Sequence, residues 1–291
     1  MGYLFAVGAA GLWATLGLLY GELTGELGIG PLTVAFFRAA LSFLILAPAL
    51  FLRARGSLRL RGRDLPLFLA FGLFGIAGFY VVYVYAVMYA GMAIAVVLLY
   101  TAPLWVVLIS WRFLGERIQK ETAIALALAM GGCALVAQVY DPGLVRLNGM
   151  GVLLGLGAGL SYALYTVFTK AAVRRYRPWT VMFYSLGFGA LFLLPLQSPE
   201  EVAAALQGEA LVRLLLLALG PTLGAAFLYA LALQRLPAGV ASTVATLEPV
   251  MGVLLAVTVR GERISFPQMI GAGLIITGVV LLSLARADAP P

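Results

Sequence analysis

Two copies of one pattern decide how this chain is organised: PLWVVLISWRFLGERI at residues 103–118 and PVMGVLLAVTVRGERI at residues 249–264. Each copy begins with a proline, continues through an apolar run and ends in Gly-Glu-Arg-Ile, with paired positions 146 residues apart. The match extends to Gly132 and Gly278, which have the same separation. Such self-similarity at a fixed distance predicts that the chain is a duplication.

Each copy begins inside a longer apolar segment of a kind that recurs throughout the chain. A helix needs about 20 mostly apolar residues to cross the hydrocarbon core of a bilayer. Ten segments meet this requirement, approximately 3–20, 32–52, 66–88, 92–112, 121–139, 149–170, 179–196, 211–233, 238–258 and 266–285. The composition agrees, because 63% of the 291 residues are hydrophobic and only 11% are charged. The sequence therefore predicts an all-α integral membrane protein with ten transmembrane helices in a lipid bilayer.

The early residues of the two halves match as well, at a separation of 149 positions. Gly2, Leu4, Gly8, Ala9 and Ala14 correspond to Gly151, Leu153, Gly157, Ala158 and Ala163. We therefore expect residues 1–145 and 146–291 to form two five-helix repeats of one membrane bundle. Since five is odd, the repeats must be inverted in the membrane, which is a common plan of secondary transporters. The match also favours a structural first helix over a cleaved signal peptide.

The distribution of Lys and Arg predicts the orientation, because cytoplasmic loops carry an excess of these residues. With the N-terminus inside, 14 of the 19 basic residues fall at the inner loops and tail, four at the outer loops, and Arg38 within a span. Arg260 and Arg263 oppose the bias in the last outer loop, where Glu262 partly offsets them. We expect a multi-pass protein of the cell membrane with both termini in the cytoplasm.

Several kinds of chemistry are disfavoured by what the chain lacks. It has no histidine, and its single cysteine, Cys133, lies in an apolar run. This argues against a disulfide framework, a metal site and a serine-histidine-aspartate mechanism. The net charge of +7 forms no basic patch separate from the spans, so no nucleic acid partner is expected. We expect no cofactor, no ATP drive and no catalytic residues; an integral-membrane enzyme and a scaffold are the alternatives of another class.

The sequence resembles the EamA-type transporters of the drug/metabolite transporter superfamily over nearly its whole length. The resemblance rests on the ten-span duplication, Phe36-Phe37-Arg38-Ala39, and the modules Pro103…Gly115-Glu116 and Leu247-Glu248-Pro249…Gly261-Glu262. It implies a secondary transporter, an exporter of small organic metabolites such as amino acids, with export of drugs or other cationic compounds as the alternative. Ala102 stands where Glu248 stands in the second half, so the halves are not chemically equivalent.

Pro103 and Pro249 lie in the middle of spans. A proline removes one helical hydrogen bond and clashes with the preceding turn, so the carbonyls of Leu99 and Ala245 lose their usual partners. Inside a membrane, such freed groups must be buried in protein or face a wet cavity. The two prolines therefore predict two broken helices that line a central site. A packing kink without solute contact is the alternative.

Arg38 and Glu248 are the two charges expected inside the membrane. Each costs about 2.5–3.5 kcal/mol at mid-bilayer on insertion scales, which favours positions inside the bundle. We expect Arg38 to clamp an anion and Glu248 to bind a coupling proton or a cation, with hydroxyls nearby at Ser242, Thr243 and Thr246. The structural alternatives are that Arg38 reaches to the interface and Glu248 caps broken backbone. A carboxylate-bearing apolar solute is favoured over a hydrophobic cation.

Aromatic residues recur at matched places in the two halves. Trp13 and Tyr162 are 149 positions apart, and Tyr83 and Tyr229 are 146 apart. Amphipathic rings suit a pocket for an organic solute, although helix packing would also use them. We predict Trp13, Tyr83 and Tyr162, together with Arg38 and Thr246, as solute-binding residues.

The Gly-Glu pairs at 115–116 and 261–262 have a structural interpretation. Glycine suits the C-terminal cap of a helix, and glutamate suits the N-terminus of the helix that follows.

Overall fold

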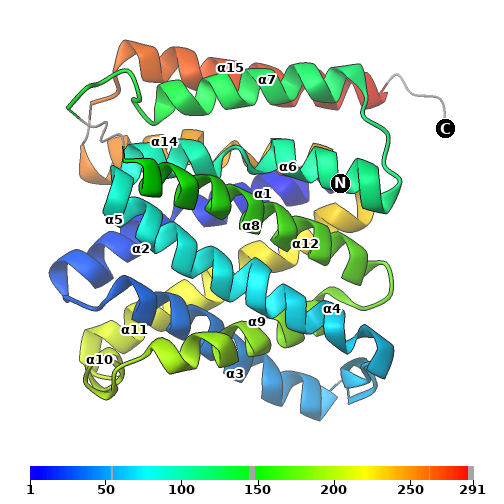
Figure 1. Cartoon of the computed structure of the whole chain (residues 1–291), viewed down its shortest axis with the longest axis vertical. Coiled ribbons are helices and arrows are strands. Elements are labelled where there is room, and N and C mark those ends of the chain that lie inside the picture. Colours follow the sequence, from blue (N-terminus) through cyan, green and yellow to red (C-terminus); the bar gives the residue numbers. More distant parts are fainter. Residues whose placement is uncertain (54, 144–147, 262, 288–291) are drawn as a thin grey trace.

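The computed structural model describes residues 1–53, 55–143, 148–261 and 263–287. Every regular element in these ranges is a helix, which confirms the all-α prediction (Figure 1). The predicted boundary between the halves, at residues 145 and 146, lies outside the described residues. So do Arg146 and Glu262.

The first half of the chain contains α1 (Gly2–Ala14), α2 (Leu16–Gly21), η1 (Glu22–Glu26), α3 (Pro31–Arg53), η2 (Arg55–Leu58), η3 (Gly62–Asp64), α4 (Leu65–Ala70), η4 (Phe71–Ala77), α5 (Gly78–Leu99), α6 (Ala102–Ile109), η5 (Ser110–Leu114) and α7 (Lys120–Val136). The second half contains α8 (Gly149–Val173), α9 (Pro178–Leu193), η6 (Leu194–Leu196), α10 (Pro199–Ala205), α11 (Gly208–Leu217), η7 (Ala218–Gly224), α12 (Ala225–Arg235), α13 (Ala238–Ala245), α14 (Glu248–Arg260) and α15 (Phe266–Ala287). The elements η1, η4, η5 and η7 are π-helical.

Eight helical stretches of the described residues are long and apolar enough to cross a membrane. They are Gly2–Glu26, Pro31–Leu52, Gly62–Leu99, Gly149–Val173, Pro178–Leu196, Gly208–Arg235, Ala238–Val259 and Phe266–Ala285. The expected spans 92–112 and 121–139 do not appear as separate stretches. A shorter apolar helix covers Ala102–Leu114, and α7 has 17 residues. The count of ten spans and the inversion of the repeats stay predictions.

The longest of these stretches, Gly62–Leu99, is not one continuous helix. Its backbone leaves the helical region at Gly91, where φ is 79° and ψ is 164°. Glycine adopts such a positive φ without the steric cost that a side chain imposes. The stretch therefore consists of two helices joined at Gly91, close to where the sequence places the boundary between the spans 66–88 and 92–112.

The helices form a bundle in which α7 and α15 lie together at one end and α3 and α9 at the other (Figure 1). Glycines allow the closest approaches between helices. A Cβ on Gly132 would lie 2.6 Å from the Gly271 carbonyl oxygen, and one on Gly278 would lie 2.9 Å from the Ala125 carbonyl oxygen. The matched glycines 132 and 278 thus serve the contact between the two helices.

The two ends of the described chain lie on the same side of the bundle. The first turn of α1 and the last turn of α15 are at one edge of the view, together with the end of α3 and the start of α4, while α10 is at the opposite edge (Figure 1). An arrangement with both termini on one side is consistent with the predicted topology.

A polar cluster ties the α3–α4 connection to the α8–α9 connection. The Asp64 carboxylate accepts hydrogen bonds from Arg175 Nη1 at 2.7 Å and from the Tyr176 hydroxyl at 2.6 Å. Burial, and after it the hydrogen bond to Asp64, raise the pKa of Tyr176 above its ordinary value, so this hydroxyl stays a donor at neutral pH. The Tyr184 hydroxyl donates to the Leu58 carbonyl at 2.6 Å in the same region.

Candidate functional site

The two prolines break their helices in the same way. Helix α5 ends at Leu99 and α6 begins at Ala102, so Pro103 is the second residue of α6. Helix α13 ends at Ala245 and α14 begins at Glu248, so Pro249 is the second residue of α14. Each helix is therefore interrupted one turn or less before its proline. Whether the two breaks line a solute site stays a prediction.

At each break, a threonine hydroxyl donates a hydrogen bond to a backbone carbonyl of the preceding turn. Thr101 Oγ1 donates to the Leu98 carbonyl at 2.6 Å, and Thr246 Oγ1 donates to the Thr243 carbonyl at 2.6 Å. Thr246 is buried, and its hydroxyl hydrogen is used by its own turn. Its oxygen could still accept a hydrogen bond, so a contact with solute at Thr246 stays a prediction.

Arg38 lies in the interior of the bundle. Only 7% of its surface is exposed, and its Nε donates to Thr222 Oγ1 at 3.1 Å. The guanidinium carbon lies 4.9 Å from the ring centre of Tyr80 and 5.7 Å from that of Tyr20, which are cation–π distances. These contacts from η7, α5 and α2 hold the charge inside the protein, so the alternative in which Arg38 reaches to the interface does not fit.

Glu248 is half-buried at the first position of α14. No hydrogen bond or ion pair within the described ranges engages its carboxylate, so the alternative of a backbone cap does not fit either. The carboxylate nevertheless lies within electrostatic range of Arg38 and of the tyrosines 83, 100 and 162. The structure thus brings the two predicted charges into one region without joining them.

Aromatic rings occupy the space beside these charges. The Trp13 ring lies edge-on to Tyr162 and Tyr229, with ring centres 6.0 Å and 5.1 Å apart. Phe79 lies between Tyr162 and Tyr83, at 5.7 Å and 5.9 Å. The predicted Trp13, Tyr162 and Tyr83 therefore form one aromatic cluster drawn from α1, α8 and α5.

Sequence reasoning missed three members of this region. They are Phe79, Tyr20 and Thr222, which the matched positions of the two halves do not single out. Thr222 follows Pro221 inside an apolar stretch, and a Pro-Thr pair within a span is the signal that could have found it.

A second cluster, which we call the Glu116 cluster, joins Glu116, Lys170 and the connection between α12 and α13. Both Glu116 oxygens accept from the Ala238 backbone nitrogen, at 3.0 Å and 2.8 Å. Lys170 Nζ lies 3.9 Å from Glu116 Oε1 and donates to the carbonyls of Leu233 and Leu236 at 2.6 Å and 2.7 Å. Glu116 thus stabilises the N-terminus of α13. The prediction that it serves the helix following it is wrong, because the chain between 115 and 120 crosses α13 first.

Gly115 and Gly261 both have the left-handed conformation, with φ of 70° and 67°, which confirms the glycine caps.

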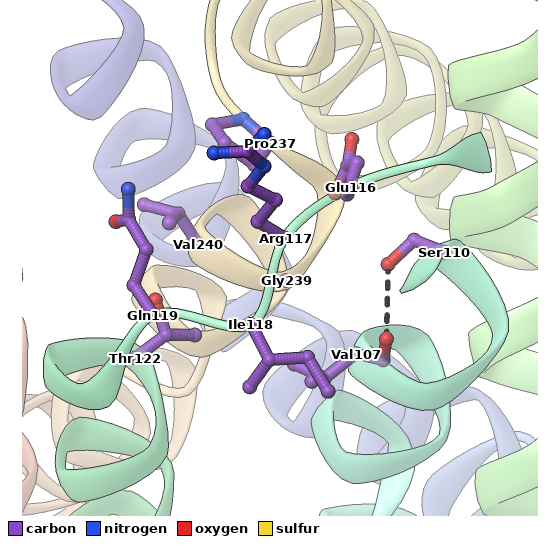
Figure 2. A pocket seen from close by; sticks show the side chains of 10 residues that line it. All are labelled: Val107, Ser110, Glu116, Arg117, Ile118, Gln119, Thr122, Pro237, Gly239 and Val240. Carbon is purple, nitrogen blue, oxygen red and sulfur yellow. Dashed lines mark hydrogen bonds between the residues drawn. The ribbon is translucent and has the colours of Figure 1, made fainter. Parts of the chain in front are cut away.

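A cavity of about 130 Å³ lies beside the Glu116 cluster (Figure 2). It is lined by Val107, Ser110, Glu116, Arg117, Ile118, Gln119, Thr122, Pro237, Gly239 and Val240. None of the predicted solute-binding residues lines it. Figure 2 shows the segment from Glu116 to Gln119 passing over the N-terminal turn of α13, so the cavity lies under a connecting segment at one end of the bundle.

An ionic cluster occupies the opposite end of the bundle. Arg213 of α11 lies 3.5 Å from a Glu22 oxygen, 3.1 Å from a Glu26 oxygen and 2.6 Å from a Glu209 oxygen. These contacts join η1 to α11. Polar contacts between elements are thus found at the Asp64 cluster, the Glu116 cluster and this ionic cluster.

A bundle of apolar helices that is broken at two prolines and carries a buried arginine and a half-buried glutamate is the architecture of a membrane transporter. The chain belongs to the EamA-like transporter family, whose model matches residues 1–138 and 149–284. The expected family is therefore confirmed.

Named relatives agree with this family. An uncharacterized transporter of Archaeoglobus fulgidus is 31% identical over 201 residues, which cover 68% of this chain and 70% of that protein. The uncharacterized transporter YwfM of Bacillus subtilis is 32% identical over 69% of this chain and 67% of that protein. The pseudopaline exporter CntI of Pseudomonas aeruginosa is 28% identical over 70% and 69% of the two chains.

A protein of known crystal structure shares the fold, with a TM-score of 0.80, 19% sequence identity and 99% of both chains covered.

Proposed function

We propose that this protein is a secondary-active transporter that exports a small organic metabolite, such as an amino acid, by alternating access. One observation carries the proposal: Arg38 and Glu248 lie inside the bundle, within electrostatic range of each other, and are not joined as an ion pair. Charges of opposite sign that are held apart inside a membrane are suited to a solute that carries both signs.

The contacts around each charge suggest how such a solute binds. The planar guanidinium of Arg38 suits a carboxylate, since its donors match the two oxygens. The carboxylate of Glu248 suits an ammonium group. The rings of Trp13, Tyr83 and Tyr162 offer apolar surface for the rest of the solute, and Thr246 borders the region at the break before α14.

Alternating access requires two related halves, and several features support them. The break at Gly91 and the break at Pro237, between α12 and α13, are 146 positions apart. This is the separation of the broken-helix prolines 103 and 249. The family match also falls on two segments of similar length. We therefore propose ten membrane passes in two inverted repeats, 1–145 and 146–291, with both termini in the cytoplasm and the protein in the cell membrane.

The direction and the energy source are part of the proposal. Export is favoured because a relative is named as an exporter. Glu248 is the proposed proton site, since a carboxylate without a fixed partner can exchange a proton for a bound ammonium group. A hydrophobic cation is the second candidate solute, favoured by the same unpaired carboxylate beside aromatic rings.

Transport by purified protein in liposomes tests the proposal. Uptake of L-phenylalanine and L-leucine should exceed that of 2-phenylethylamine, which lacks the carboxylate. Preference for the amine would favour the cationic class, and no transport of either class would favour an enzyme or a scaffold. Arg38→Lys, which keeps the charge and loses the planar fork, should weaken binding of L-phenylalanine, and Arg38→Gln should weaken it further.

A further inference from the structure

The π-helical segment η7 contains a proline followed by a threonine. The two residues change the hydrogen bonds that the backbone of this segment makes. Pro221 has no N–H, so it removes one backbone donor from this π-helical segment. Thr222 Oγ1 donates to the Leu217 carbonyl at 2.8 Å. The hydroxyl has one hydrogen, which is thereby committed, and its oxygen is left as an acceptor.

That acceptor meets Arg38. The Arg38 Nε donates to Thr222 Oγ1 at 3.1 Å, and one turn further along α3 the Ser42 hydroxyl donates to the Ala218 carbonyl at 3.2 Å. Ser42 is fully buried and Thr222 is 4% exposed. Helix α3 therefore docks on η7 through two buried polar contacts, each to a group in the segment around Pro221.

The chain contains a second seven-residue π-helix, η4, and its contact with α9 is made differently. Gly72 of η4 lies against Phe188, and Ile76 lies against Gly189. This contact uses glycines and apolar side chains. Packing a helix on a π-helical segment thus requires no arginine and no hydroxyl, so the pair formed by Arg38 and Thr222 needs an explanation other than packing.

We propose that Thr222 is a positioning residue that orients the Arg38 guanidinium for a solute carboxylate, a role that rests on the proposed function of Arg38. An arginine has five N–H donors, and Thr222 takes the one on Nε. The rings of Tyr80 and Tyr20 lie 4.9 Å and 5.7 Å from the guanidinium carbon. With Nε held by Thr222 and two rings beside the group, the guanidinium cannot turn freely, and the donors on its terminal nitrogens are held in one orientation.

The test compares two substitutions of Thr222 with different hydrogen-bonding capacity. Binding of radiolabelled L-phenylalanine to the purified full-length protein is measured, and 2-phenylethylamine serves as the competitor without a carboxylate. Thr222→Val keeps the shape and should weaken L-phenylalanine binding about three- to tenfold, the usual effect of losing one orienting hydrogen bond. Affinity for 2-phenylethylamine should not change. Thr222→Ser keeps the hydroxyl, so this variant should bind L-phenylalanine with nearly the affinity of the unmodified protein.

Thr169→Val is the matched control. Thr169 is also buried, and its hydroxyl donates within its own helix, to the Tyr165 carbonyl at 2.7 Å. It should change neither affinity. If Thr222→Val is not monodisperse in detergent, Thr222→Ala carries the same expectation.

Arg38→Gln, measured alongside, separates the inference from the proposed function. Unchanged L-phenylalanine binding in a folded Arg38→Gln variant, or no binding by the unmodified protein, overturns both. If Arg38→Gln weakens binding and Thr222→Val does not, only the role of Thr222 is overturned. Equal weakening for L-phenylalanine and 2-phenylethylamine in Thr222→Val would also overturn it, because orientation toward a carboxylate should affect one solute alone.

Discussion

Both carboxylate oxygens of Glu116 lie within 3.0 Å of the backbone nitrogen of Ala238, although 122 positions separate the two residues. The contact joins a connecting segment of the first half to the first turn of a helix in the second half. It is mostly shielded, since the side chain of Glu116 is 14% exposed and that of its neighbour Lys170 is 12% exposed. In the proposed mechanism this tie must break whenever the protein opens at that end.

Glu116→Gln should therefore loosen the end of the bundle at α13. The amide keeps one acceptor and loses the charge that favours a helix N-terminus and Lys170. A cysteine at position 110, in the cavity of Figure 2, should react about three- to tenfold faster with a small maleimide in inside-out vesicles, in a Cys133→Ser background. Glu121→Gln, nearby in the first turn of α7, should leave the rate unchanged. Equal rates in all three proteins would contradict a closing role for Glu116.

Glu248→Gln should abolish transport driven by a pH gradient and weaken exchange of solute without a gradient, because the amide carries no charge for the solute ammonium group, while the protein stays folded. The substitution removes the only proton-binding group proposed for coupling and keeps the size of the side chain. Both reactions can be followed in the same proteoliposomes, with and without an imposed gradient. Full gradient-driven uptake by the variant would limit Glu248 to a structural role.

The orientation can be tested with single cysteines in a Cys133→Ser background. Gln119 and Glu200 are both exposed and lie at the connection before α7 and in α10. Glu200→Cys should react with an impermeant thiol reagent in intact cells, and Gln119→Cys should react only after permeabilisation. The reverse pattern would place both termini outside.

Asp64→Asn should lower thermal stability without changing solute affinity. Asp64 is 4% exposed and accepts from Arg175 and Tyr176, so losing its charge weakens two partly buried contacts between connecting segments. Cys133 is buried and is the only cysteine, so a thiol-reactive dye reports unfolding directly. The midpoint should fall by several degrees, whereas Arg177→Gln, at an exposed position in the same region, should leave it unchanged.

Local rules predicted the features that depend on a single residue type. The breaks at Pro103 and Pro249 follow from the missing N–H, and the caps at Gly115 and Gly261 follow from the freedom of glycine at positive φ. The repeat pattern also marks Gly132, which lies against Gly271 of α15 in the structure.

Contacts between distant parts of the chain could not be predicted in this way. Thr222 lies 184 positions from Arg38, and nothing in the sequence indicates that η7 is placed beside α3. The partner of Glu116 was misassigned for the same reason, since sequence rules favour the helix that follows and the fold supplies one from the other half. Rules for single residues thus identify the charged residues, whereas the fold determines which residues contact them.

The glycine-lined contact between α7 and α15 has a consequence for how the protein is made. Helix α7 leaves the ribosome before the whole second half, yet its partner α15 is the last helix of the described chain. Lipid tails are as apolar as the side chains they replace, so a helix waiting in the bilayer gains little from premature association. Gly132 can accept the backbone of Gly271 only after α15 has been made, so α15 completes the packing of the fifth predicted span.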